Sequence, residues 1–596
     1  MKKAFLPLIM LLLFLVFLSS CDEVKLPFVS ADTTEAETPF FDETDLSSDG
    51  LDFTPNGDGT CALSGLGTCP DKNIIVPLYS PEGYLVTEIS DRAFSAVGRI
   101  VSITLPDSIT RIGDYAFSKC TSMKSITLGN GVVSIGSAAF SLCKALKEIN
   151  IPSSVTSIGD AAFEDCFSLA SVILGENLES IGSGAFRQCQ DLSEIVIPDK
   201  VKDIGEQTFW GCRYLSSAVL GRSVITIDKS AFENCQALTS IVLPEGLLSI
   251  GDSAFLHCSA LTNVALPESV TAIGTWAFAH CSQLLSVELP KTLSSISDYT
   301  FYNCSSLSSV TIDKNVTSVG SWAFGQCTSL PSITLPESVT EIGNSAFFVC
   351  SNLTAVILDE SLTSIGRDAF KNCSNLKEIL IPNGVESIGN SAFSSCSSLS
   401  SVTFGRNLKN ISKEAFLNCT GLMSIVLPDS LEVIESAAFK DCSSLKFVTF
   451  GNNIKTIESQ AFMNCKSLQS VRLYAGVESI GDSAFENCTD LNAVFFKEGL
   501  KAIGEQAFKN CQSLTSITSP EGLETIGNQA FSYCGNLRTV TLPRSITTIG
   551  SFAFAYCPSI TQTFYPGTRE EWYAVEIGPN NGYLQNSIVF IRPMDP

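Results

Sequence analysis

The sequence predicts an α/β solenoid built from about 21 coils of 23 residues each. Phenylalanine recurs every 23 residues from Phe94 to Phe554 without one insertion or deletion. A cysteine follows three residues after each of these phenylalanines except the first, where Val97 stands, and Leu, Ile or Met comes three residues later. A fixed period in this range is the signature of a solenoid, whose coils bury their apolar faces against one another.

Each coil is predicted to hold one strand and one short helical turn. In a representative copy, Leu261, Val264 and Leu266 alternate with polar residues as in a half-buried strand, and Pro267 ends it. A Val-x-x-Ile-Gly segment follows. Because Ser, Asp or Glu replaces this glycine in several copies, we expect no left-handed backbone there. Asp, Ser or Asn often precedes Ala-Phe, which suits the cap of a helical turn.

Both flanks of the repeats are predicted to be caps, at residues 51–85 and 561–596, since an open solenoid end exposes its core. The first contains Asn56-Gly57-Asp58-Gly59, which favours a hairpin turn and lacks the carboxylate spacing of a calcium loop. In the second, Thr568 and Glu571 have the spacing of a capping box at the start of a helix.

The N-terminus resembles a bacterial export signal. Residues 1–20 have a basic start followed by an apolar run, and the motif Leu18-Ser19-Ser20-Cys21 spans the end of this segment. This motif resembles a lipobox, which implies cleavage before Cys21 and a lipid on its thiol. The alternative is an uncleaved anchor, although the apolar run is shorter than the roughly 20 residues of a membrane span. Residues 21–50 are acidic and are predicted to form a disordered tether.

The repeated unit Leu-x-x-Ile-x-Leu-Pro-x-x-Val-x-x-Ile-Gly-x-x-Ala-Phe-x-x-Cys resembles the BspA-like, or Treponema pallidum-type, leucine-rich repeats over about residues 86–560. The resemblance implies a leucine-rich-repeat lipoprotein of the cell surface that binds proteins or glycans of host or neighbouring cells. An envelope scaffold that organises other proteins of the same cell is the alternative. A fold does not name a ligand, so the resemblance names none, and the oligomeric state also stays open.

Composition argues against several other functions. The formal net charge is −24, with 37 basic and 61 acidic residues, which disfavours nucleic acid and leaves the lipid as the expected membrane contact. Only two histidines are present, so acid–base chemistry has few candidate groups. We predict no catalytic residue, metal site or cofactor, and therefore no enzyme.

The cysteines need a separate interpretation, because 20 of the 23 share one repeat position. Equivalent positions in adjacent coils lie about 5 Å apart with parallel Cβ directions, whereas a disulfide needs converging Cβ atoms about 3.8 Å apart. We therefore predict a ladder of reduced, buried thiols. A disulfide between Cys61 and Cys69 stays open. The pairs His257-Cys258 and His280-Cys281 are not expected to bind a metal, because histidine points outward where cysteine points inward.

Two surfaces are candidates for binding. The outward positions of the strands, expected on the concave face, carry mostly Ser, Thr, Val or Ala, with Ser and Thr at Ser125, Thr127, Ser309, Thr311, Ser332, Thr334, Ser401 and Thr403. These residues are typical of any exposed strand surface because of their β-propensity. They would also form a flat, weakly charged face on which an extended partner could dock.

The second candidate is a group of aromatic residues two positions before phenylalanine, where the side chain should point outward. In three consecutive coils this position holds Trp276, Tyr299 and Trp322, about 5 Å apart if the coils are regular. Further apolar residues follow phenylalanine nearby, at Leu256, Tyr302 and Phe348. Contiguous exposed aromatics are typical of partner-binding sites. The alternative is that these side chains only lean on neighbouring coils.

Overall fold

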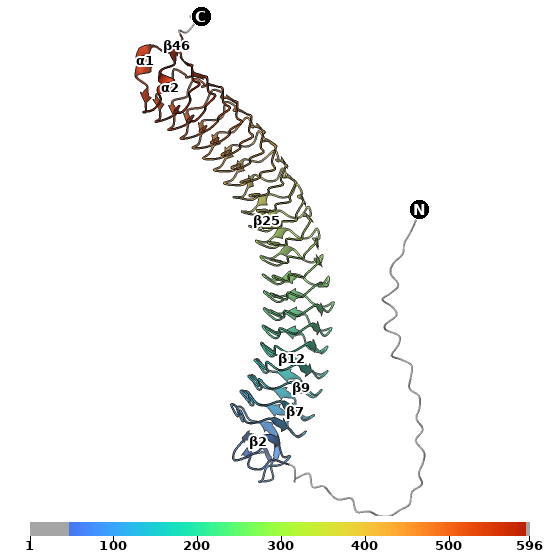
Figure 1. Ribbon diagram of the computed structural model, residues 1–596. Coiled ribbons are helices and arrows are strands. Elements are labelled where there is room, and N and C mark those ends of the chain that lie inside the picture. The colour runs from blue at the N-terminus through green and yellow to red at the C-terminus, as the bar shows by residue number, and fades with distance from the viewer. Residues whose placement is uncertain (1–46, 592–596) are drawn as a thin grey trace, which may run out of the picture. The chain divides into compact units, whose positions relative to one another are not determined.

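The computed structural model describes residues 47–591, in which the chain forms one continuous stack of coils (Figure 1). Most coils contribute a three-residue strand to one side and a two-residue strand to another, and strands of one kind run parallel; in the coil of Asn263 an isolated bridge to Ser286 replaces the three-residue strand. Partners are 23 residues apart, so that Ser157 lies between Ser134 and Ser180. The predicted leucine-rich-repeat solenoid is confirmed. The two helices described are four and five residues long, and neither could cross a membrane.

The three-residue strands follow the predicted Leu-x-x-Ile-x-Leu pattern, with only the middle side chain directed into the core. They are β5 (Ser102–Thr104), β7 (Ser125–Thr127), β9 (Glu148–Asn150), β11 (Ser171–Ile173), β13 (Glu194–Val196), β15 (Ser217–Val219), β17 (Ser240–Val242), β20 (Ser286–Glu288), β22 (Ser309–Thr311), β24 (Ser332–Thr334), β26 (Ala355–Ile357), β28 (Glu378–Leu380), β30 (Ser401–Thr403), β32 (Ser424–Val426), β34 (Phe447–Thr449), β36 (Ser470–Arg472), β38 (Ala493–Phe495), β40 (Ser516–Thr518) and β42 (Thr539–Thr541).

The two-residue strands were not predicted. They arise where the Val-x-x-Ile-Gly segment pairs with the same segment of the next coil, which gives most coils two strands where one was expected. They are β6 (Arg111–Ile112), β8 (Ser134–Ile135), β10 (Ser157–Ile158), β12 (Ser180–Ile181), β14 (Asp203–Ile204), β16 (Thr226–Ile227), β18 (Ser249–Ile250), β19 (Ala272–Ile273), β21 (Ser295–Ile296), β23 (Ser318–Val319), β25 (Glu341–Ile342), β27 (Ser364–Ile365), β29 (Ser387–Ile388), β31 (Asn410–Ile411), β33 (Val433–Ile434), β35 (Thr456–Ile457), β37 (Ser479–Ile480), β39 (Ala502–Ile503), β41 (Thr525–Ile526) and β43 (Thr548–Ile549).

At the N-terminal end of the stack, four strands lead into the first coils. They are β1 (Asp52–Pro55), β2 (Thr60–Gly65), β3 (Asn73–Ile75) and β4 (Leu85–Ile89). Strands β1 and β2 are antiparallel, and Asn56 N donates to Thr60 O at 2.9 Å across their turn. The predicted hairpin is therefore confirmed. Strand β2 then pairs parallel with β4, which starts the stacking direction of the coils.

At the C-terminal end, a short helical segment closes the stack. Its elements are β44 (Gln562–Tyr565), α1 (Arg569–Tyr573), β45 (Glu576–Ile577), α2 (Gly582–Gln585) and β46 (Ile588–Phe590). The predicted capping box is confirmed, since Thr568 and Glu571 each bond the other's backbone N–H. Trp572 of α1 is buried against the ring of Tyr565, with centroids 5.2 Å apart. The cap thus places an aromatic pair over the end of the core.

The core of the stack is a continuous column of the repeated phenylalanines, which we call the spine. Consecutive spine rings are 5.1–5.7 Å apart between centroids and within 16° of parallel. All of them are fully buried or nearly so. Parallel rings follow from the repeat itself, because every coil places the same side chain at the same position. Burial of one such side chain stabilises the fold by about 1.5–3 kcal/mol.

The cysteine ladder lies beside the spine and is made of free, buried thiols. Each ladder thiol also donates a hydrogen bond to the carbonyl of the spine phenylalanine one coil earlier, as Cys304 Sγ does to Phe278 O at 3.2 Å. Burial raises the pKa of Cys166 to about 12, so the thiol stays protonated and able to donate. Cys61 and Cys69 are likewise free and buried.

The segment around each spine phenylalanine is a series of tight turns, and the predicted helical turn was wrong. Ala138 and Leu142, two residues before and after Phe140, have left-handed φ angles of 50° and 63°. Their N–H groups and that of Phe140 donate to carbonyls of the next coil, all at 2.7 Å. Because left-handed residues such as Ala138 and Leu142 recur within each turn, every second N–H group points along the stack. A helix would direct these donors back to its own carbonyls and would leave the coils unlinked.

The polar residue before Ala-Phe also has a different role from the one predicted. Asp114 caps no helix; its Oδ1 accepts from Ser137 N of the next coil at 2.7 Å. Gly136, just before Ser137, has no left-handed φ angle. A Cβ there would lie 2.5 Å from that same carboxylate oxygen. The expectation of no left-handed backbone is therefore confirmed here. Glycine is favoured at this position because the coils approach closely.

A spine phenylalanine and a ladder cysteine should differ in how much each contributes to the stability of its coil. We expect Phe301→Ala to destabilise its coil by about 3–5 kcal/mol, because it leaves a large cavity between rings. Cys304→Ala removes one small atom and one weak hydrogen bond and should cost about 1–2 kcal/mol. Native-state hydrogen exchange of amides in coils 278–327 would measure both. Equal effects of the two substitutions would contradict this ranking.

Candidate functional site

The strongest candidate site is an aromatic group in the middle of the stack, formed by Trp276, Tyr299, Tyr302, Trp322 and Phe348. We call it the aromatic cluster. Its first, second and fourth members occupy the left-handed position two residues before the spine, with φ angles of 61°, 57° and 58°. A large side chain at this position is unusual in the chain, where Ser, Ala and Gln are common.

The rings of the aromatic cluster contact one another across four coils. Trp276 and Tyr299 are stacked with centroids 4.0 Å apart and planes 7° apart, and Tyr299 continues to Trp322 at 5.9 Å. Tyr302 stands edge-on to all three at 5.6–5.7 Å. Phe348 closes the far end at 4.9 Å from Trp322. The expected juxtaposition of these five residues is therefore present.

All five side chains are half-buried, so they point outward less than expected. Parallel stacking covers both faces of Tyr299 and one face each of Trp276 and Trp322. Leu256, the other predicted member, is a half-buried aliphatic side chain one coil before Trp276.

Two residues that sequence reasoning missed help to build the cluster. A Cβ at Gly325 would lie 2.9 Å from Trp322 Cε3 and 3.2 Å from Tyr302 Cδ2. Glycine directly after the spine phenylalanine therefore lets both rings pack over the backbone. Gln326 Nε2 donates to the Tyr302 hydroxyl at 2.9 Å. Gly325, at a position that is variable in the other coils, was the signal in the sequence that could have revealed this close packing.

The two histidines extend the cluster toward the N-terminus. Their rings are stacked with centroids 4.4 Å apart, and His280 stands edge-on to Tyr302 at 5.4 Å. Asn303 Nδ2 lies 3.0 Å from His280 Nδ1, which fits donation to a neutral ring. Burial and the neighbouring His257 lower the pKa of His280.

The adjacent cysteines do not join these histidines. Cys258 and Cys281 are fully buried, and their thiols donate to Phe232 O and Phe255 O, while His257 is exposed. Residues 47–591 contain no group of three or more His, Cys, Asp or Glu side chains arranged to hold a metal ion.

The second candidate is the surface of the three-residue strands. Their first and third side chains are exposed, including the predicted pairs in β7, β22, β24 and β30. Several coils also expose apolar side chains there: valine, which was expected, and the larger isoleucine and leucine, which sequence reasoning missed, at Ile173, Val196, Val242, Ile357, Leu380 and Val426. The surface is thus less polar than its serines and threonines suggested.

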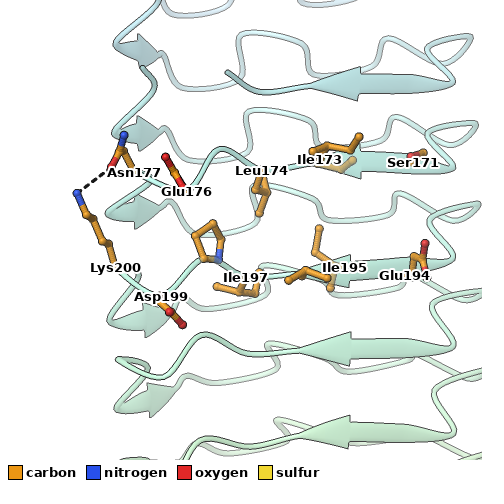
Figure 2. A pocket seen from close by; sticks show the side chains of 13 residues that line it. Ser171, Ile173, Leu174, Glu176, Asn177, Glu194, Ile195, Ile197, Asp199 and Lys200 are labelled. Atoms are coloured by element: carbon orange, nitrogen blue, oxygen red, sulfur yellow. Dashed lines mark hydrogen bonds between the residues drawn. The ribbon is translucent and has the colours of Figure 1, made fainter. Parts of the chain in front are cut away.

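Part of this strand surface is hollow. Strands β11 and β13 belong to different sheets, and an open cavity of about 830 Å³ lies over them, lined by Ile173, Leu174 and Val196 among others. Figure 2 shows Asn177 and Lys200 at one end of it, where Lys200 Nζ donates to Asn177 Oδ1 at 2.9 Å. The cavity lining also includes Glu176, Glu194 and Asp199, with Glu194 at the opposite end from Asp199.

Comparison with known proteins identifies the repeat. The family described as "BspA type Leucine rich repeat region (6 copies)" matches residues 87–216, 209–331, 294–423, 409–512 and 455–573. No curated protein matches the chain.

Several solved structures are similar to it. A leucine-rich repeat protein from Bacteroides ovatus is 23% identical over 88% of this chain and all of its own, with a TM-score of 0.33. A leucine rich cell surface protein from Faecalibacterium prausnitzii is 23% identical over 92% of this chain and 99% of its own, with a TM-score of 0.26. The leucine rich repeat protein of T. pallidum is 24% identical over 39% of this chain and 88% of its own, with a TM-score of 0.28.

The lowered pKa of His280 predicts a pH effect on this region. Because the unfolded chain binds the proton more tightly than the folded one, stability should begin to fall as the pH drops below the ordinary value of 6.5. The loss should be complete below the folded pKa. An NMR titration of the two histidines should show His280 titrating below 6.5.

His280→Asn is the matched control, since asparagine occupies the same position at Asn303. This variant should lose the pH dependence and keep the fold. Titration of His280 at or above its ordinary pKa would contradict the burial that the structure assigns to it.

Proposed function

Because the chain belongs to the BspA-type leucine-rich repeat family, we propose that it is a cell-surface adhesin that binds proteins of host or neighbouring cells. The observation that carries this proposal is the aromatic cluster. Stacked solenoid coils supply a long, repeated surface for recognition of macromolecules, and in the aromatic cluster both tryptophans and both tyrosines contact one another across successive coils of that surface.

The composition of the cluster suits a protein partner. Tryptophan and tyrosine dominate the residues whose truncation weakens protein interfaces most, often by about 2 kcal/mol or more. The cluster is also pre-organised, since its rings already hold one another in place, so little side-chain freedom is lost on binding. Because stacking covers both faces of Tyr299 and one face of each tryptophan, the cluster offers ring edges as well as faces, and edges suit a protein loop better than a flat sugar ring.

The proposed location rests on the N-terminal sequence. The motif Leu18-Ser19-Ser20-Cys21 lies outside the described residues, and we propose that Cys21 carries a lipid after cleavage of residues 1–20. Residues 21–50, mostly outside the described part, would then tether the solenoid to the membrane. Two or more acyl chains hold a protein stably at a bilayer, whereas one chain alone is marginal.

The double substitution Trp276→Ala with Trp322→Ala tests the proposed site. We expect it to weaken binding to the target cells by at least about tenfold, which is about 1.4 kcal/mol. The fold should persist with a nearly unchanged melting temperature, because alanine already adopts this left-handed position at Ala138 and Ala161. Adhesion of cells that display the full chain, and the melting temperature of the purified chain, are the two measurements.

Trp210→Ala is the matched control, because Trp210 lies outside the cluster and contacts Arg187 instead. It should bind like the parent protein. Unaltered adhesion of the double variant, with loss caused instead by Ser309→Lys and Ser332→Lys, would move the site to the strand surface.

Lipidation at Cys21 is tested by metabolic labelling with a radioactive fatty acid. The parent protein should be labelled and Cys21→Ala should not, because no other thiol follows a lipobox-like motif. Protease treatment of intact cells should then release the solenoid. Equal labelling of the two proteins would end the lipid proposal, and protection from protease would favour an internal envelope scaffold.

A further inference from the structure

A second group of aromatic side chains lies at the C-terminal end of the stack, far along the chain from the aromatic cluster. Tyr533, Phe552, Tyr556 and Tyr583 are 46%, 38%, 56% and 45% exposed. These rings are more accessible than the half-buried rings of the aromatic cluster. Large side chains that stay this exposed on neighbouring elements need an explanation.

The arrangement leaves one ring face free. Tyr533 and Tyr556 are stacked with centroids 4.4 Å apart and planes 14° apart. Tyr556 belongs to the last full coil, so only its face toward Tyr533 is covered by an equivalent ring. It also lines a cavity of about 380 Å³ together with Phe552 and Tyr583. We call this the cap cavity; its volume lies within the range of about 300–1,000 Å³ typical of small-molecule sites.

The walls of the cap cavity are held in place by a buried amide. Asn581 is 1% exposed. Its Oδ1 accepts from Phe554 N at 2.9 Å, and its Nδ2 donates to the carbonyls of Gly550 and Gly578, also at 2.9 Å. These bonds fix the loop between β45 and α2 onto the last coil. A wall fixed before binding reduces the entropy lost when a ligand is bound.

Besides its two tyrosines, the cap cavity is lined by two side-chain amides, Asn580 and Asn586, and its lining contains no charged side chain. Both residues are exposed. Within residues 47–591 neither side chain makes a hydrogen bond to another group of the protein. Each amide offers two N–H donors and one carbonyl acceptor, so the cavity combines free aromatic surface with neutral, two-way hydrogen-bonding capacity.

We propose that the cap cavity binds a neutral sugar residue of an oligosaccharide. A pyranose ring has an apolar face of C–H groups that can lie on the free face of Tyr556. Its hydroxyl groups both donate and accept, which matches the two amides. A proline-rich peptide also lies well on tyrosine rings, but proline lacks an N–H, so the amide carbonyls would find no donor. Absence of charge in the lining favours a neutral ligand over an acidic sugar.

Binding is tested with the purified full chain by titration calorimetry. The probes are cello-, malto- and N-acetylglucosamine trisaccharides, with a sialylated trisaccharide and a proline-rich decapeptide for comparison. At least one neutral trisaccharide should bind, and Tyr556→Asn should weaken it at least about tenfold. Asparagine adopts the same left-handed position at Asn510, so this variant should fold normally. Asn586→Ala should also weaken binding, by loss of hydrogen bonds.

Tyr573→Ala is the matched control, because Tyr573 is 75% exposed in the same cap and does not line the cap cavity. It should bind the sugar normally. The variant Trp276→Ala with Trp322→Ala should do the same, which separates this site from the proposed adhesion site. The proposal is overturned if no neutral trisaccharide binds, if Tyr556→Asn leaves binding unchanged, or if only the acidic sugar or the peptide binds.

Discussion

The axial hydrogen bonds between coils are the interaction on which the rest of this structure depends. In the turns around the spine, every second N–H group points along the stack, as Phe140 N does toward Ala162 O at 2.7 Å. The ladder thiols add a second set of axial bonds to the spine carbonyls. Together these bonds favour repeats of equal length, since a residue inserted within the bonded turns would shift the donors away from their acceptors; the longer spacing from Phe552 N to Pro579 O occurs only where the stack enters its C-terminal cap. The uninterrupted period of 23 residues follows from that preference.

The same geometry creates the candidate binding sites. The two left-handed positions that flank each spine phenylalanine are tied by backbone bonds and hold side chains that range from buried to exposed, and residues of many types occupy them. When aromatic residues occupy equivalent positions in successive coils, their rings must stack. The position before the spine produces the aromatic cluster around Tyr299, and the position after it produces the pair Tyr533 and Tyr556. The two groups differ in their surroundings. The aromatic cluster has further coils on both sides along the stack, whereas the pair Tyr533 and Tyr556 ends at the C-terminal cap.

Much of the fold follows from the sequence, because a strict period reports directly on stacking. The spine, the reduced ladder, the hairpin at Asn56 and the capping box at Thr568 were all predictable from residue types and spacing. The left-handed turns were not predicted. Before phenylalanine, Ala, Ser and Gln give no sign of a positive φ angle, whereas after it Asn is common, as at Asn487 and Asn510, and its tolerance of this conformation was a signal left unused. The aromatic cluster was found as a group, but its packing depends on Gly325. The hollow over β11 and β13 was missed because it depends on where adjacent strands separate.

The most direct test of the stacking account is the chemical state of the ladder. Axial bonds from each thiol to the preceding spine carbonyl require S–H groups, so every ladder cysteine must be reduced and shielded. The account predicts that iodoacetamide leaves the ladder of the native chain unmodified. Denaturation without reductant should then allow modification of all 22 described cysteines, counted by intact mass. If denaturation exposes few new thiols, adjacent coils are joined by disulfides, and the proposed basis of coil register is wrong.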